Sequence, residues 1–286
     1  MKTWTMCVLA VVCAAAVCRA EDYRLEQRER VQRTLSGATA VDVNNVNGFI
    51  HVTGDSGNTV RLDGEKIMRA RDSEEMERAK REVTLDINQK DGIAQFYVNG
   101  PFRDHDHASS NHGFHERESR HYEVTYNLTL RVPRTVALTL KTVNGEVTCA
   151  DTSGKFEVNG VNGSITMNGI AGSGSVRTVN GPTTVSFREN PKAESEFHSL
   201  NGKVEVTFQP NLSADMRVKT FNGSAYTDFE STALAAQPTT NQASAAQNGT
   251  RWVYRKNQFA NLRVGKGGPE LTFETLNGDI RIRKAQ

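Results

Sequence analysis

The feature that most constrains the fold is a short unit that recurs along the chain, an apolar residue followed by Asn and Gly. From Asn144, the steps to the next four Asn residues of the unit are 18, 18, 21 and 21. A nearly constant period of this length is typical of repeat architectures, in which each unit packs mainly on its neighbours. We assign seven repeats, with their Asn-Gly pairs at Asn47-Gly48, Asn144-Gly145, Asn162-Gly163, Asn180-Gly181, Asn201-Gly202, Asn222-Gly223 and Asn277-Gly278.

The residues on both sides of each Asn-Gly pair alternate between apolar and polar. Leu138 and Leu140 precede one pair, and Val147 and Cys149 follow it. Period-two alternation of this kind is typical of strands with one buried face. Each repeat is therefore predicted to contain a strand, an Asn-Gly turn, a second strand and a second turn.

Two all-β architectures fit this unit. Asn-Gly is a strong signal for β-hairpins, so a hairpin-built β-sandwich or propeller is one solution. The other is a β-helix or β-solenoid of ~20-residue repeats with one short helix, in which equivalent strands stack in parallel. Pro182 favours the solenoid, because it follows Asn180-Gly181 at a position where a tight hairpin needs an N–H donor.

The large apolar residue before each Asn also favours the solenoid. In a hairpin it would lie on the solvent face, whereas at a coil corner we expect it to turn inward and stack. Asn and Gly both tolerate the positive φ of sharp corners. Asn side chains stacked at ~4.8 Å could also form a hydrogen-bonded ladder. The residues expected to turn inward are Val143, Val179, Leu200, Phe221 and Leu276.

Residues 1–20 predict a signal peptide. Lys2 is followed by an apolar run that is too short to span a bilayer comfortably, and cleavage is expected after Ala20. A lipoprotein signal with Cys18 at its lipidation position and an uncleaved anchor helix are the alternatives. No other segment reaches transmembrane length. After cleavage only Cys149 would remain, which excludes an intramolecular disulfide and indicates a small buried residue.

The mature chain has a single predicted domain. Residues 21–35 are expected to form an N-terminal arm, either mobile or a short helix, and residues 36–286 the β-repeat domain. Loop inserts are predicted at 100–120 and 231–250. A helix is predicted from Asp72 to Arg81, with Asp72 as N-cap, closing one end of the stack or binding a partner. Asp91-Gly92 predicts a hairpin within residues 83–98.

The first insert holds the one cluster of residues suited to metal binding. Imidazole and carboxylate groups suit Zn, Ni or Cu, and Asp104, Asp106 and Glu116 lie among the histidines. Their spacing is irregular and the segment reads as a loop, whereas a built site needs ligands held by rigid elements. We therefore expect a solvated loop and assign no metal or other cofactor. The candidate ligands are His105, His107, His112 and His115, with His121 close behind.

The sequence contains no nucleophile elbow, phosphate loop or zinc-protease motif. It predicts no catalytic residues, and the chain is expected not to be an enzyme. Some β-helix enzymes act on polysaccharides through clustered acids and bases, so a carbohydrate-active enzyme is one alternative. A solvated exterior is the simpler interpretation of the acids and bases in the repeats, which are Glu146, Glu157, Lys203, Glu205 and Lys219.

The repeats resemble those of the bacterial "putative adhesin" β-strand-repeat family, an exported family of unknown function. The resemblance covers about residues 36–286 and is strongest over 136–229 and 267–283. The last of these, from Gly267 to Ile282, is similar to the C-terminal signature of that family. It implies a bacterial origin, an envelope or extracellular location and a solenoid-like fold, and it supplies no catalytic residues.

These observations predict an exported, non-enzymatic β-repeat protein that serves as an adhesin-like structural or binding module of the cell envelope. Its location would be periplasmic, cell-surface or extracellular, and its partner an envelope protein or a glycan. Lys and Arg together number 35 and Asp and Glu 33, and Lys2 and Arg19 would leave with the leader. The resulting neutrality argues against nucleic-acid binding. The alternatives are the carbohydrate-active enzyme and a metal-binding envelope protein acting through the histidine-rich loop.

Overall fold

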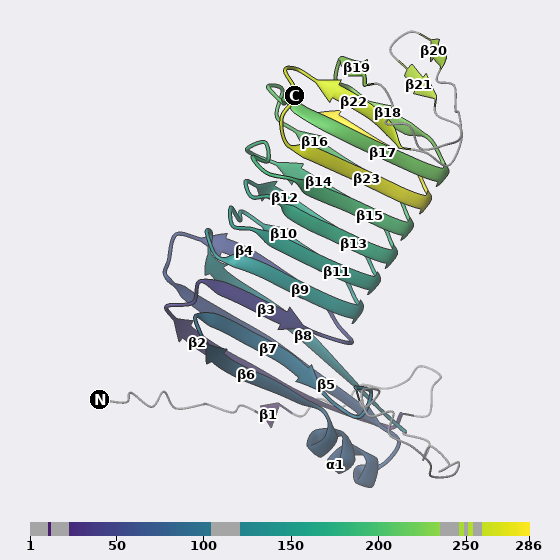
Figure 1. Cartoon of the computed structure of the whole chain (residues 1–286). Coiled ribbons are helices and arrows are strands. Elements are labelled where there is room, and N and C mark those ends of the chain that lie inside the picture. Colours follow the sequence, from purple (N-terminus) through teal and green to yellow (C-terminus); the bar gives the residue numbers. More distant parts are fainter. Residues whose placement is uncertain (1–10, 13–22, 104–120, 235–245, 249–250, 254–258) are drawn as a thin grey trace, which may run out of the picture.

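The computed structural model describes residues 23–103, 121–234 and 259–286, together with the short strands at 11–12, 246–248 and 251–253. In these residues the fold is all-β, with two large sheets packed face to face and a single helix (Figure 1). The prediction of an all-β chain with one helix is confirmed for this part of the chain.

Each large sheet contains 11 strands. The first, sheet A, runs in spatial order β1 (Val11–Val12), β2 (Leu25–Ser36), β5 (Thr59–Ala70), β8 (Tyr122–Pro133), β4 (Ile50–Asp55), β10 (Val147–Ala150), β12 (Ile165–Ile170), β14 (Thr183–Phe187), β16 (Val204–Phe208), β24 (Ile280–Lys284) and β18 (Ala225–Thr227). The second, sheet B, runs β19 (Ser231–Ala233), β22 (Ala260–Val264), β17 (Ala214–Asn222), β23 (Glu270–Asn277), β15 (Ser195–Asn201), β13 (Gly174–Asn180), β11 (Phe156–Asn162), β9 (Ala137–Asn144), β3 (Ala40–Asn44), β7 (Ile93–Asn99) and β6 (Thr84–Lys90). A separate pair is formed by β20 (Ala246–Asn248) and β21 (Arg251–Val253).

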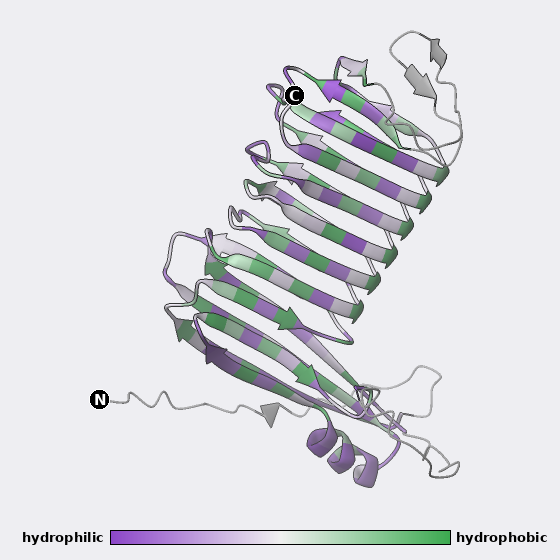
Figure 2. Ribbon diagram, in the orientation of Figure 1, coloured by the Kyte–Doolittle hydropathy of each residue, from purple (hydrophilic) through white to green (hydrophobic). Residues whose placement is uncertain are grey.

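Successive repeats stack in parallel and in register. Phe156 of β11 lies beside Leu138 of β9, and Val147 of β10 lies beside Ile165 of β12. Each repeat contributes one strand to sheet B, the Asn-Gly turn, and one strand to sheet A (Figure 1). The inward positions of both sheets form one continuous hydrophobic core, as the alternation in the sequence predicts. Figure 2 shows this alternation of apolar and polar residues along each strand.

The spatial order of the repeats departs from their order in the chain. The last pair of strands, β23 and β24, lies between β15–β16 and β17–β18, although β17–β18 comes earlier in the sequence. An aromatic cluster is built at this junction. Phe197 and Phe273 stack with ring centroids 5.3 Å apart, and Phe187 and Phe208 stack at 5.1 Å. The inserted repeat thus completes the core.

The N-terminal end of the stack is built differently from the repeats. Strands β2, β5 and β8 are long and antiparallel to one another in sheet A, while β6 and β7 form an antiparallel hairpin in sheet B. The prediction of a mobile or helical arm over 21–35 is wrong, because residues 25–36 form β2 and pair with β5 along its whole length. The regular inward apolar pattern is missing from β2, which has no fully buried residue and lies near the edge of sheet A with only the two-residue β1 beyond it.

Helix α1 (Ser73–Glu82) packs against β5 and β8 at this end (Figure 1). Asp72 is its N-cap and accepts a hydrogen bond from the Glu75 N–H at 3.0 Å, as predicted. Lys66 closes the other end of the helix. Lys66 is 5% exposed, and its ammonium group donates to the carbonyl oxygen of Val83 at 2.7 Å. Val83 follows the last residue of the helix, at the end where the helix dipole is negative.

Two further sequence predictions concern turns and inserts. The hairpin at Asp91-Gly92 is confirmed, with φ of 52° and 79° at its two turn residues. The loop predicted over 231–250 contains β19 and β20 in its described part, and residues 235–245 and 249–250 lie outside the described residues.

Candidate binding surface

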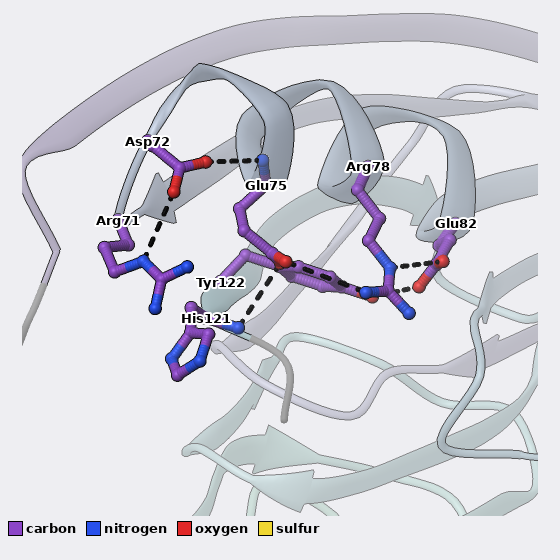
Figure 3. Close-up of polar contacts among 7 residues, drawn as sticks. All are labelled: Arg71, Asp72, Glu75, Arg78, Glu82, His121 and Tyr122. Atoms are coloured by element: carbon purple, nitrogen blue, oxygen red, sulfur yellow. Dashed lines mark hydrogen bonds and ion pairs between the residues drawn. The ribbon is translucent and has the colours of Figure 1, made fainter. Parts of the chain in front are cut away.

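The four candidate metal ligands of the histidine-rich insert, for which we expected a solvated loop, lie outside the described residues. His105, His107, His112 and His115 all fall within 104–120. Only His121 is described, immediately before β8, where its backbone N–H donates to Glu75 Oε2 of helix α1 at 3.3 Å (Figure 3). In the described part of the chain, no group of three His, Cys, Asp or Glu residues could hold a metal ion.

Polar side chains of α1 interact with one another and with the residues at the start of β8 (Figure 3). Arg78 donates to Glu82 at 2.8 Å and lies 3.6 Å from a carboxylate oxygen of Glu75. The hydroxyl group of Tyr122 donates to the second carboxylate oxygen of Glu82. These contacts anchor the helix to β8, so the arrangement is a structural one.

Cys149 is the one cysteine in the described residues, and it lies inside the hydrophobic core. Its side chain is 1% exposed, and its sulfur lies 3.4 Å from the hydroxyl group of Thr152. Burial raises the pKa of the thiol to about 11, which keeps it protonated near neutral pH. The prediction that Cys149 is a small buried residue is confirmed.

The acids and bases that could have served a carbohydrate-active enzyme are spread over different surfaces. Glu157 and Lys219 project from sheet B, where each has its own ion-pair partner. Lys203 and Glu205 lie together on sheet A at 3.1 Å. Glu146 lies 2.9 Å from His51 near the turn. The five residues do not converge on one reacting position.

The turns instead form a continuous ladder of asparagines. Asn162 donates from Nδ2 to Oδ1 of Asn144 at 2.9 Å, and Asn180 donates to Asn162 in the same way. The ladder runs in the spatial order Asn47, Asn144, Asn162, Asn180, Asn201, Asn277 and Asn222. Each asparagine donates to its predecessor, so the amides line up along one edge of the molecule.

Glycine follows each asparagine because the stack leaves no space for a side chain. At Gly163, φ is 145°, and a Cβ atom there would overlap the carbonyl oxygen of Gly145 in the repeat below. The prediction of positive φ is confirmed for this glycine but is wrong for the asparagines. Within the described residues, positive φ outside glycine occurs only at Asp91 and Asp151. Asparagine is therefore used for its amide rather than for its backbone freedom.

The apolar residue before each asparagine points outward, so the prediction that it turns inward is wrong. Thr142, two positions before Asn144, is buried, and the pleat simply continues, which places Val143 on the solvent side. The bend comes only at the Asn-Gly pair. These side chains form what we call the apolar row, with 36 to 55% of each residue exposed: Val143, Val161, Val179, Leu200, Leu276 and Phe221.

The apolar row lies beside the asparagine ladder at the ends of the sheet B strands. In-register pairing places Asn162 beside Asn180 and Gly160 beside Thr178, so Val161 lies next to Val179. Figure 2 shows apolar colour toward the ends of these strands. With neighbouring strands ~4.8 Å apart, six side chains form a row about 24 Å long.

The rest of the outer face of sheet B is charged and largely neutralised by its own ion pairs. Arg177 pairs with Glu196, and Lys219 pairs with Glu274 at 2.9 Å. His198 lies between those two carboxylates, 3.4 Å from each. The apolar row therefore borders a surface with little unpaired charge.

The same face ends in a small polar hollow at β3, β7 and β6. Its volume is about 150 Å³. Its polar lining consists of Asp42, Asn44, Asp86, Asn88, Gln95 and Tyr97. Neither this hollow nor the outward direction of the apolar row was found from the sequence. The alternation through Thr142 would have revealed the row, whereas the hollow depends on which strands pair.

Comparison with known proteins gives remote structural likeness. No protein-family model matches the chain, and no curated protein matches it. A "putative cell adhesion protein" from Clostridium sporogenes is 11% identical, with 90% of this chain and 100% of that chain covered and a TM-score of 0.39. A "putative adhesin" from Bacteroides fragilis is 10% identical, covering 90% and 97%, with a TM-score of 0.38.

A third solved structure, a "putative lipid binding protein" from Parabacteroides distasonis, is 9% identical and has a TM-score of 0.28 over 90% of this chain and 97% of that chain. At these identities and TM-scores the likeness assigns neither a family nor an activity. Among the described residues, no helix has the length and apolar character needed to cross a membrane.

Proposed function

We propose that the chain is an exported, non-enzymatic β-solenoid that serves as an adhesin-like binding module of the bacterial cell envelope. The apolar row is the observation that carries this proposal. Exposed apolar patches bordered by polar residues are typical of interaction sites, and the row places six such side chains on parallel, in-register strands. The solenoid supplies a rigid support, and the row supplies the contact.

The chemistry of the row favours a protein partner. Its members are three valines, two leucines and a phenylalanine, which offer apolar surface and no hydrogen-bonding group. A length of about 24 Å matches about 16 residues of an α-helix, at 1.5 Å per residue. The asparagine ladder alongside it would provide a polar rim, as at other protein interfaces. The hydroxyl groups of a sugar chain would find no hydrogen-bond partners in this row.

The test compares capture of envelope proteins by the chain from residue 21 onward and by two variants. The first variant carries Val179→Asn, Leu200→Asn and Leu276→Asn in the apolar row. The control carries Thr148→Asn and Thr166→Asn on the outer face of sheet A, where both residues are half-buried. Circular dichroism and thermal unfolding establish that all three fold.

We expect wild type and control to retain the same envelope protein and the row variant to retain at least tenfold less of it. Titration of that protein in purified form should then reproduce the difference. Equal retention by the row variant would contradict the proposal. Export is tested separately by fractionating cells that express the full chain with a C-terminal tag, where recovery in the cytoplasm alone would contradict it.

A further inference from the structure

The hollow on sheet B is a second candidate site, separate from the apolar row. The strand register arranges its six polar side chains in two lines of three. One line contains Asp42, Gln95 and Asn88, which come from three adjacent strands. We refer to this set as the open line.

The second line is held in place by its neighbours. It contains Asn44, Tyr97 and Asp86, again side by side. Arg103 donates to Oδ1 of Asn44 at 2.8 Å and its guanidinium lies 4.2 Å from the centre of the Tyr97 ring. Asp86 accepts hydrogen bonds from Thr84 and Asn99.

The open line differs from the rest of the face because its polar groups are unused. In the described residues, the side chains of Asp42, Gln95 and Asn88 have no hydrogen-bond or ion-pair partner. Farther along the same face, Lys219 and Glu274 neutralise each other at 2.9 Å, and Asn159 donates to Glu157 at the same distance. The hollow thus concentrates unsatisfied donors and acceptors at one end of an otherwise self-paired surface.

We propose that this hollow binds a saccharide that is neutral or carries an amine. Sugar hydroxyl groups both donate and accept hydrogen bonds, and the two amides with the Asp42 carboxylate offer both kinds of partner. Tyr97, 36% exposed, offers aromatic ring surface on which the C–H groups of a sugar ring can pack. A ligand with many hydroxyls is the class that uses this combination of groups.

The charge and size of the hollow further restrict which saccharides it can bind. Asp42 and Asp86 are the two charged residues of the lining, and Arg103 is engaged by Asn44 and the Val98 carbonyl. Acidic sugars would meet repulsion there. The volume of about 150 Å³ is below the roughly 300–1,000 Å³ of sites for drug-sized ligands, so one sugar unit would occupy it, with the others along the sheet.

The test uses the ¹⁵N-labelled chain from residue 21 onward and three oligosaccharides: cellotetraose, which is neutral; glucosamine tetramer, which carries amines; and tri-galacturonate, which is acidic. We expect the side-chain amide signals of Asn88 and Gln95 to shift on titration with one or both of the first two, with Kd of about 0.1–10 mM, as a small site allows. Tri-galacturonate should bind at least tenfold more weakly.

Gln95→Ala and Asn88→Ala should each weaken binding by at least fivefold, whereas Asn159→Ala, on the self-paired part of the same face, should leave it unchanged. Thermal unfolding of each variant shows that it folds. The proposal is overturned if neither of the first two sugars binds at 10 mM, a concentration at which a Kd of 10 mM corresponds to a binding free energy of about 2.7 kcal/mol. It is also overturned if the acidic sugar binds as well or the Ala variants bind normally. None of these residues belongs to the apolar row, so failure here leaves the proposed function standing.

Discussion

The side-chain amide of Asn162 donates to Oδ1 of Asn144 at 2.9 Å, and its own Oδ1 accepts from Asn180 at the same distance. Asn162→Ala removes both bonds, each worth about 0.5–1.5 kcal/mol. Because the ladder is solvent-exposed, we expect a loss of about 1–2 kcal/mol in the free energy of unfolding. Urea titration with an unchanged m-value measures it.

The matched control is Asn222→Ala at the end of the ladder. Among the described residues, Asn222 makes one ladder bond, to Asn277, so its loss should be about half as large. Equal losses at the two positions would show that the ladder contributes nothing beyond local turn preference.

Two glycines in one repeat should respond to alanine in opposite directions. At Gly163 the new Cβ would overlap the carbonyl oxygen of Gly145, and φ of 145° excludes alanine, so we expect a loss of at least about 3 kcal/mol or failure to fold. At Gly160 the new Cβ would lie 3.4 Å from Ile165 Cδ1, an ordinary contact. Gly160→Ala should be neutral or stabilise the protein by up to about 1 kcal/mol.

Thermal and urea unfolding of the two variants check this prediction. A mild effect of Gly163→Ala would mean that the repeats can separate locally, contrary to the close stacking of the turns.

Because the apolar row points outward, alanine substitutions at two apolar positions of one strand should lower the free energy of unfolding by different amounts. Leu200 is 43% exposed and Phe197 is fully buried, although both belong to β15. Phe197→Ala should cost about 3–5 kcal/mol, whereas Leu200→Ala should cost no more than about 1 kcal/mol, because much of its surface already faces water. Urea titration separates the two, and a large loss at Leu200 would indicate that its side chain is buried after all.

Because Lys66 is buried, we expect the free energy of unfolding of the wild type, relative to that of Lys66→Met, to rise at alkaline pH. Burial lowers the pKa of its ammonium group in the folded state below the ordinary value. The folded chain therefore binds fewer protons than the unfolded chain between those two pKa values, and stability increases with pH across that window. Above the unfolded pKa of about 10.4 the penalty is absent.

Lys66→Met removes this titration, so the free energy of unfolding of wild type minus that of Lys66→Met should increase between pH 8 and pH 10.5. A difference that stays flat or falls over this range would show that the folded-state pKa of Lys66 is not lowered. Urea titrations at several pH values supply the measurement.

Cys149 should react with thiol reagents only when the core opens. Its side chain is 1% exposed, and burial raises its pKa to about 11. In the chain from residue 21 onward, which contains this one cysteine, we expect alkylation at pH 8 to be slower than in urea by a factor on the order of 10³ or more. Rapid labelling without denaturant would contradict the buried position.

The repeats, their inward residues and the Asp72 N-cap could be read from the sequence because each depends on a local pattern. The direction of Val143 could not be settled by the corner argument, since the outcome depends on where the bend begins. Strand β2 was missed because a strand near the edge of a sheet, with only the two-residue β1 beyond it, needs less apolar alternation than an interior strand. The hollow was missed because Asp42 and Asn88 are 46 positions apart and come to lie on either side of Gln95 only through the pairing of β3, β7 and β6.

The placement of β23 and β24 has a consequence for how the protein is made. Strands β23 and β24 are synthesised after β17 and β18, yet they lie between β15–β16 and β17–β18 in the two sheets. Until they are made, Phe197 of β15 lacks Phe273, the residue on which it stacks, and β16 lacks its neighbour β24. A chain terminated before β23 would therefore have a gap inside both sheets, with buried apolar side chains exposed on either side of it. Synthesis of β23 and β24 is thus a condition for the stability of strands made before them.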